Sequence, residues 1–202
     1  MEIDGDMELH LRRRAKAELR KRARALRSTV PRDAILARSA RIQRALEDLP
    51  ELASASRIAL FYPIEGRNEV DLIALDARLR ARGARIAYPT IDPDTGLMTF
   101  RFVPDLEAMQ EQGYGFREPS PTEEEATTLD VIITPCLQVD PQGHRLGYGA
   151  GYYDRTLPRF CPPALALAVA FDFQLISEVP ATPTDVPVSV VVTDARIFRV
   201  GA

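Results

Sequence analysis

Three glycines at alternate positions, Gly147, Gly149 and Gly151, lie between two charged residues suited to phosphate chemistry. Glycine lets the backbone adopt positive φ and approach a ligand closely, and successive amides of such a loop can converge on an anion. Arg145 precedes the glycines and offers a fork of donors to phosphate oxygens. Asp154 follows them and offers a hard carboxylate oxygen to a magnesium ion bridging those phosphates. This combination predicts a nucleotide-binding site, and a helix beginning after the loop would add a favourable dipole.

The glycine spacing is weak evidence by itself, because turns and tight helix starts also use glycine. The dinucleotide fingerprint Gly-x-Gly-x-x-Gly is excluded, since Tyr152 occupies the position of the third glycine. No Lys-Ser or Lys-Thr pair follows the glycines, so this is not a Walker A sequence either. The sequence therefore indicates a different kind of phosphate loop.

The residues around the loop make the pattern specific. Residues 129–135, then Asp140, then residues 145–155 resemble the signature of the 5-formyltetrahydrofolate cyclo-ligase family. The resemblance spans roughly residues 12 to 194 and includes further matching segments, at residues 16–20, 69–71, 170–175, 179–180 and 184–188.

The resemblance implies an ATP-dependent enzyme that converts 5-formyltetrahydrofolate to 5,10-methenyltetrahydrofolate and releases ADP and phosphate. The formyl oxygen is a poor leaving group until it is phosphorylated, after which N10 can attack the same carbon and close the ring. Such a transfer requires positioning and charge neutralisation rather than a covalent nucleophile. The sequence is consistent with this, since it holds no convincing Ser-His-Asp or Cys-His set.

By the same resemblance, Lys16 and Arg20 contact the phosphates of ATP. They lie one turn apart on a predicted helix, so both side chains can point at one polyanion. The other nucleotide contacts implied are Arg145, Gly147, Gly149, Gly151 and Tyr153.

The resemblance also implies the residues that meet the folate. Glu69 matches the glutamate that contacts folate in the family, with Glu65 as an alternative because the preceding loop is longer than expected. Tyr148 and Tyr152 either hold the pterin and formyl groups or form pocket walls. The full set of candidate folate contacts is Tyr62, Glu69, Tyr148 and Tyr152, and the candidate catalytic residues are Arg145, Tyr152 and Asp154.

Two aspartates are the candidate magnesium ligands. The resemblance assigns Asp185 this role together with Asp154, whereas the residues alone leave open a turn aspartate that bonds its own backbone. Loops at the carboxyl ends of neighbouring parallel strands share one edge of a sheet, so the two carboxylates are expected to converge. Thr184 and Ser189 depart from the family pattern, where histidine and aspartate are frequent.

Composition bounds the class of protein. With 202 residues and 46% apolar content, the chain (1–202) is expected to form a single domain. It carries a net charge of −3 and no apolar run near the length of a membrane span. The acidic start lacks the apolar core of a signal peptide, and the two cysteines have no metal or redox spacing. We expect a cytoplasmic monomer with reduced thiols.

Residues 8–28 predict a long basic helix, with nine Lys or Arg and two Glu between positions 8 and 27. Its expected buried stripe is apolar, formed by Leu11, Ala15, Leu19, Ala23 and Leu26. The charges could form a solvated face or a nucleic-acid patch, but no aromatic residues interleave with them and the rest of the chain is acidic. ATP is therefore the favoured partner, and nucleic acid is not expected.

The remaining pattern predicts an α/β fold. A second helix begins at residues 31–33 and another spans 69–82, while strands are expected at 57–62, 85–89, 96–103, 132–134, 165–171 and 188–192. Residues 104–128 read as an irregular segment over the sheet, and part of it resembles the Gly-x-x-Glu-Pro element that lies near the folate pocket in the family, with Phe116 expected to pack rather than to stack on the ligand. The alternation implies a largely parallel sheet, and the resemblance implies the three-layer scaffold of sugar-phosphate isomerases and coenzyme A transferases. Those enzyme classes, and a non-enzymatic binding protein, are the competing interpretations, but neither accounts for Arg145, the glycine loop, Asp154 and Asp185 together.

Overall fold

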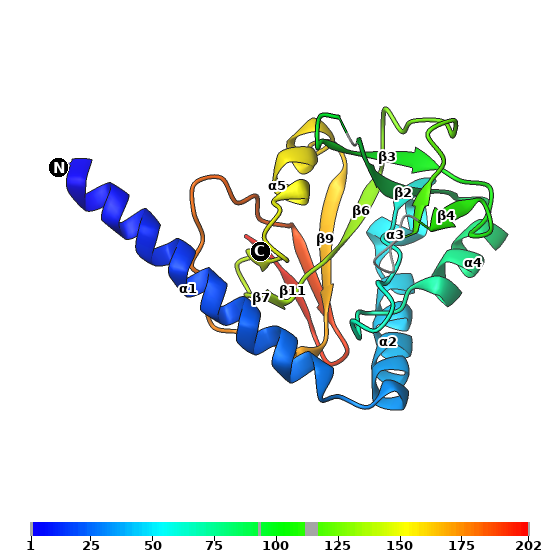
Figure 1. Cartoon of the computed structure of the whole chain (residues 1–202). Helices are drawn as coiled ribbons and strands as arrows, with labels where there is room; N and C mark the ends of the chain where they lie inside the picture. Colours follow the sequence, from blue (N-terminus) through cyan, green and yellow to red (C-terminus); the bar gives the residue numbers. More distant parts are fainter. Residues whose placement is uncertain (1, 93, 112–116, 202) are drawn as a thin grey trace.

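Seven strands form one mixed sheet in the computed structural model, which describes residues 2–92, 94–111 and 117–201, with the side chains from residue 5 onward. The strand order is β11-β10-β9-β6-β1-β2-β3 (Figure 1). The bounds are β1 (Arg57–Ala59), β2 (Arg85–Ile91), β3 (Met98–Phe102), β6 (Val131–Pro135), β9 (Leu165–Ala170), β10 (Val190–Thr193) and β11 (Ile197–Arg199).

The five inner strands are parallel, whereas β3 and β11 pair antiparallel at the two edges. Inner strands such as β6 and β9 consist almost entirely of apolar residues because both faces of the sheet are covered. The expected α/β fold with a largely parallel sheet is confirmed. The strand expected at 132–134 is central, because β6 is the fourth of the seven strands.

Alternate residues of each strand pack into two separate cores. One face carries Ile58, Ile133 and Val169 against α2 (Arg32–Glu47), α3 (Pro50–Ser54) and α4 (Ile73–Ala81). The opposite face carries small side chains such as Ala59 and Ala168. These leave room for a second layer to pack closely, made of α5 (Tyr152–Thr156), the 3₁₀ turn η1 (Leu157–Arg159), the hairpin β7 (Gln138–Val139) with β8 (Arg145–Leu146), and α1 (Glu2–Ser28) (Figure 1).

Helix α1 contacts the body through its basic face, not through the apolar stripe that its sequence predicts. Leu11 and Leu26 are about half exposed, and of the expected stripe only Ala23 is buried. Among the described side chains of α1, the other buried ones are two basic residues, Lys16 and Arg27. The prediction was wrong because this face meets carboxylate, carbonyl and hydroxyl groups rather than a hydrocarbon surface.

Other boundaries also differ from the sequence-based expectations. The helix expected at 69–82 begins at Ile73, so Glu69 lies in the irregular chain before α4 rather than at a helix start. The first strand is only three residues long. The segment expected to be irregular holds a short hairpin, β4 (Met109–Glu111) with β5 (Arg117–Pro119). Phe116 lies outside the described residues. Within the described part of the chain, no helix has the length and apolar character needed to cross a membrane.

Candidate active site

The glycine loop follows β8, so a short hairpin separates it from the central strand β6. Gly149 and Gly151 adopt positive φ, 114° and 68°, which residues with a Cβ rarely adopt. Gly147 does not, and a Cβ there would meet no atom within 4 Å, so the expectation of positive φ holds for two of the three glycines. The helix after the loop, α5, has only five residues. Its dipole therefore contributes little to anion binding at the loop.

Asp140 holds this hairpin in place. Its side chain is fully buried and accepts hydrogen bonds from the backbone N–H groups of His144 (2.9 Å) and Val179 (2.8 Å). Gly143 lets the hairpin pack against the chain at Val188, just before β10. Any larger residue would clash, because a Cβ at this position would lie 2.3 Å from the carbonyl oxygen of Val188. The sequence motif contains Asp140, and the structure adds its role: it fixes the turn that delivers Arg145.

Arg145 and Asp154 form an ion pair beneath the loop. The Nη2 of Arg145 lies 3.1 Å from Oδ1 of Asp154 and donates to the carbonyl oxygen of Val186 at 3.0 Å. The same Oδ1 accepts the N–H of Val186 at 3.1 Å. Asp154 therefore contacts Val186, the immediate neighbour of Asp185 in the chain. Nε of Arg145 is buried and has no hydrogen-bond partner among the described residues.

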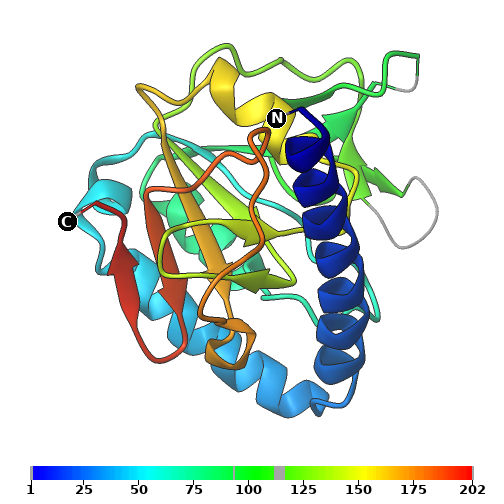
Figure 2. The same cartoon turned by 90° about the vertical axis from the view of Figure 1, so that its left-hand side faces the viewer.

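Helix α1 runs beside the segment that leads into β10 (Figure 2). The ammonium of Lys16 donates to the carboxylate of Asp185, and Arg12 donates to the carbonyl oxygen of Ala181 at 2.6 Å. Oδ2 of Asp185 also accepts the N–H of Thr182 at 2.5 Å. Burial alone would raise the pKa of Asp185, but these hydrogen bonds hold the pKa below its usual value.

The two candidate metal ligands thus lie near one another, but not for the expected reason. Asp185 precedes the amino end of β10 instead of following the carboxyl end of a strand. The contact of Asp154 with Val186, and of Lys16 with Asp185, brings the aspartates into the layer that covers the alanine-rich face. Thr184 and Ser189 are exposed, so the two departures from the family pattern fall on side chains at the surface.

Arg20 joins α1 to the glycine loop. Its Nε donates to the carbonyl oxygen of Gly147 at 2.9 Å. A Cβ at Gly149 would come 3.5 Å from the guanidinium carbon of Arg20, so the loop and the arginine are already in close contact. The candidate nucleotide contacts Lys16, Arg20 and Arg145 therefore border one continuous region.

Farther along α1, Arg27 borders a buried polar cluster that contains Glu69 and Tyr148. Oε1 of Glu69 accepts the hydroxyl of Tyr148 at 3.0 Å and its Oε2 accepts the N–H of Ile64 at 2.8 Å. Arg27 donates to the Tyr148 hydroxyl and lies 3.8 Å from Glu69. Burial raises the pKa of Glu69 despite these partners. Burial, with the neighbouring Glu69 carboxylate, raises the pKa of Tyr148 to about 12, so the phenol stays a donor at neutral pH.

The alternative residue, Glu65, is exposed, whereas the side chain of Glu69 is only 4% exposed. Sequence reasoning missed Arg27 altogether. Helical spacing could have indicated a role for Arg27, because residues 16, 20 and 27 lie on one side of an α-helix.

The other three candidate tyrosines do not belong to the polar cluster of Arg27, Glu69 and Tyr148. Tyr153 packs against the core, its ring centroid 6.4 Å from that of Phe100. Tyr152 also packs against that core, and Tyr62 packs against the opposite one. Among the described residues, no hydrogen bond joins these three to Glu69 or Tyr148.

Comparison with known proteins bears on this arrangement. The family model for the 5-formyltetrahydrofolate cyclo-ligase family matches residues 12–194. The chain belongs to this family. A 5-formyltetrahydrofolate cyclo-ligase of Mycolicibacterium smegmatis is 36% identical over 71% of this chain and 76% of its own length. One from Escherichia coli K12 is 30% identical over 74% of this chain and 84% of its own length.

Structural comparison agrees with the cyclo-ligase assignment. The NMR structure of Aquifex aeolicus 5,10-methenyltetrahydrofolate synthetase superposes with a TM-score of 0.81 at 29% identity and covers 93% of both chains. The chain is accordingly a ligase of folate one-carbon metabolism that uses ATP as a co-substrate. The resemblance stated from the sequence is confirmed.

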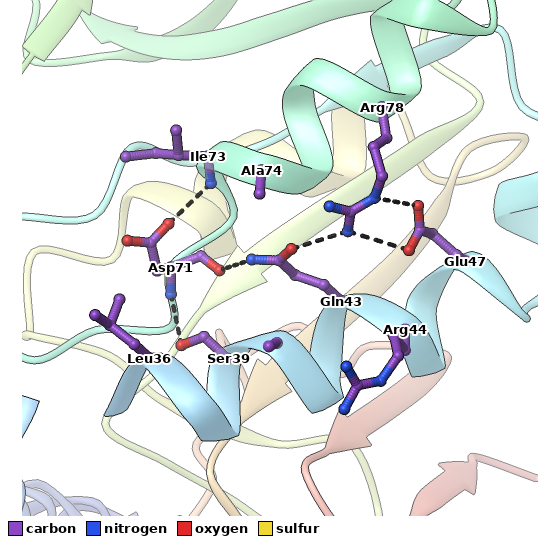
Figure 3. A pocket seen from close by; sticks show the side chains of 10 residues that line it. Leu36, Ser39, Gln43, Arg44, Glu47, Asp71, Ile73, Ala74 and Arg78 are labelled. Carbon is purple, nitrogen blue, oxygen red and sulfur yellow. Dashed lines mark hydrogen bonds and ion pairs between the residues drawn. The ribbon is translucent and has the colours of Figure 1, made fainter. Parts of the chain in front are cut away.

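This cyclo-ligase has a pocket between α2 and α4 (Figure 3). These helices cover the face of the sheet opposite to the one that α5 covers. The polar groups of the pocket bond one another: Ser39 accepts the N–H of Asp71 at 3.0 Å, Gln43 donates to the carbonyl oxygen of Asp71 at 2.7 Å, and Arg78 pairs with Glu47 at 2.6 Å. These contacts join the two helices. None of the candidate site residues lines this pocket.

Proposed function

We propose that the chain closes the ring of 5-formyltetrahydrofolate with ATP and magnesium at the region under α1. The observation that carries this proposal is the contact of one helix with both halves of the candidate site. Lys16 and Arg20 meet Asp185 and the glycine loop, and Arg27 meets the pair formed by Tyr148 and Glu69. A single element thus borders the candidate nucleotide contacts and the candidate folate contacts.

In the first step the formyl oxygen attacks the γ-phosphorus of ATP, and ADP departs. Lys16, Arg20 and Arg145 neutralise the phosphate charge as it redistributes. The buried Nε of Arg145, which lacks a partner among the described residues, supports anion binding at this point. Tyr152 and Tyr148 are the candidates for holding the formyl group and the pterin, and Gly147, Gly149, Gly151 and Tyr153 for lining the nucleotide.

In the second step N10 attacks the activated formyl carbon, loses its proton, and phosphate leaves with the former formyl oxygen. The products are 5,10-methenyltetrahydrofolate, ADP and phosphate. No covalent bond to the protein forms in either step, so the role of the chain is to orient the two substrates and to exclude competing water.

Asp154 and Asp185 are the residues that would hold magnesium. They fit such an ion, because each directs one oxygen to protein donors while its second oxygen has no hydrogen-bond partner among the described residues. Within the described part of the chain, no group of three or more Asp, Glu, His or Cys could hold a metal. This suits magnesium, which takes one or two carboxylates together with substrate phosphates and waters. When bound, the ion supplies charge neutralisation between the phosphates.

The proposal extends to the setting of the enzyme. We place it in the cytoplasm as a monomer, with ATP and reduced folate as its partners. The basic charges that face the body on α1 are engaged with Asp185, Gly147 and Tyr148, which supports a nucleotide-binding role over binding of nucleic acid.

The test is formation of the methenyl product, followed by its own absorbance, from 5-formyltetrahydrofolate and Mg-ATP. Phosphate release should equal product formed. Folded protein that yields no product with both substrates and magnesium present would refute the proposal. The variant Lys16→Ala with Arg20→Ala should lose apparent affinity for ATP, whereas salt-sensitive binding of DNA or RNA with unchanged ATP kinetics would favour the nucleic-acid interpretation.

A further inference from the structure

The carboxyl end of α1 and the loop before α4 are closed into a ring of hydrogen bonds. The side-chain amide of Asn68 donates to the backbone carbonyl oxygens of Arg27 (3.1 Å) and Val30 (3.0 Å). The next residue is Glu69, which accepts the hydroxyl of Tyr148, and Tyr148 in turn accepts from the guanidinium of Arg27. The ring therefore leaves α1 at the backbone of Arg27 and returns to it at the side chain of the same residue.

The backbone of Asn68 is shaped for this contact. Its φ is 50°, and it is the only residue other than glycine with positive φ in the described part of the chain. Asparagine adopts this region more readily than most residues do, yet an uncommon conformation persists only where its surroundings hold it. Here the two carbonyl oxygens at the end of α1 hold it, and the turn directs Glu69 inward.

Helix α1 also contacts the glycine loop at a second position. Arg20 donates to the carbonyl oxygen of Gly147, the residue next to Tyr148. Two contacts from α1, seven positions apart on one side of the helix, thus fix the main chain and the hydroxyl of neighbouring loop residues. A shift of α1 would move both.

Stability alone does not account for Arg27. Its side chain is 3% exposed, and its nearest carboxylate, that of Glu69, lies 3.8 Å away without a direct hydrogen bond. Removing a guanidinium from water is costly, and a buried ion pair commonly contributes little net stability compared with apolar side chains. Its contacts with Tyr148 and the Cys136 carbonyl instead fix where the phenol and the carboxylate lie.

We infer that Arg27 and Asn68 are positioning residues for the reduced folate: they hold Tyr148 and Glu69 in their binding geometry and tie this pair to the helix that carries Lys16 and Arg20. Nucleotide bound at Lys16 and Arg20 then steadies α1 and strengthens folate binding, and folate strengthens nucleotide binding by the same factor. The inference rests on the proposed function.

The experiment compares Arg27→Met with Arg24→Met, a matched control one turn earlier on the exposed side of α1. Isothermal titration measures the Kd of 5-formyltetrahydrofolate alone, the Kd of a non-hydrolysable ATP analogue alone, and the folate Kd at saturating analogue. Arg27→Met should weaken folate binding by about tenfold or more, as expected for the loss of a charge-assisted hydrogen bond. It should leave the Kd of the analogue nearly unchanged, and the gain in folate affinity on adding analogue should disappear.

Two further variants keep the test decisive if Arg27→Met does not fold. Arg27→Lys retains the charge and should recover part of the folate affinity. Asn68→Gly removes the amide while tolerating positive φ, and should also abolish the effect of the analogue. The inference is overturned if Arg27 and control variants bind folate alike, if folate and analogue lose affinity equally, or if the wild type shows no coupling. A wild type without methenyl product would instead refute the proposed function.

Discussion

Lys16 and Asp185 are 169 positions apart in the chain, yet the ammonium of one donates directly to the carboxylate of the other. The first is a candidate phosphate contact and the second a candidate magnesium ligand. Arg145 and Asp154 repeat the arrangement at 3.1 Å. Two of the three candidate phosphate-binding cations, Lys16 and Arg145, are thus each paired with a candidate metal ligand. Binding of Mg-ATP would exchange these partners: the two cations would turn to phosphates and the carboxylates to the metal.

Loss of Lys16 should affect ATP specifically. Lys16→Ala removes a charge-assisted phosphate contact of roughly 1.5–3 kcal/mol, and each 1.4 kcal/mol is about tenfold in an equilibrium constant. We therefore expect the KM for ATP to rise about tenfold or more while the KM for folate changes little. Lys21→Ala is the control, because Lys21 is exposed on the same helix. Steady-state kinetics with equal effects of the two substitutions would contradict the role of Lys16.

The ion pair of Asp185 should make stability depend on pH. Its pKa is lowered in the folded protein, against about 3.9 in an unfolded chain. The folded state therefore favours the ionised carboxylate, whose stabilising contribution is present above the unfolded pKa and disappears as pH falls through the folded pKa. Urea unfolding of wild type and Asp185→Asn should show a difference in free energy at pH 7 that shrinks below about pH 4. A difference independent of pH would show that the charge is not involved.

Asp154 should be tested through its metal dependence. Asp154→Asn keeps the size of the side chain and removes its charge, so turnover should fall strongly and require more magnesium, while folding and folate binding are largely retained. Asp185→Asn should show the same effect in milder form. Asp48→Asn, at an exposed position ending α2, controls for the general effect of charge. Turnover is measured against magnesium concentration, and an unchanged magnesium profile in Asp154→Asn would remove this residue from the metal site.

Glu69 should be separable from Glu65 by kinetics and by pH. Glu69→Gln should raise the KM for folate and leave that for ATP, whereas Glu65→Gln, at an exposed position, should change neither. The opposite pattern would assign the folate contact to Glu65.

The pKa of Glu69 is raised by burial, so the sign of its pH effect is opposite to that of Asp185. Ionising Glu69 costs stability as pH rises above about 4.3, its unfolded pKa. The stability of Glu69→Gln relative to wild type should therefore increase with pH through this window. Urea unfolding between pH 4 and 7 measures it, and a relative stability that falls with pH would contradict the assigned burial.

The sequence by itself determined the sheet, the glycine loop and the family. Apolar runs such as those of β6 and β9 predict buried parallel strands, because a strand covered on both faces has no polar side. The spacing of Arg145, the glycines and Asp154 predicts phosphate chemistry because those groups lie within one short segment. The resemblance over residues 12–194 then specified the reaction, and the comparisons confirmed the family.

Only the tertiary structure decided which face of α1 is buried and what Glu69 contacts. Hydrophobic periodicity predicts that the apolar stripe containing Leu11 and Leu26 is buried. It depends only on the spacing of apolar residues within one segment and carries no information about the surface that the helix meets. The opposing surface is built from residues more than a hundred positions away, including Asp185 and Tyr148, and it is polar. A basic face pairs with such a surface better than an apolar one, because each buried carboxylate, carbonyl and phenol needs a donor or an acceptor.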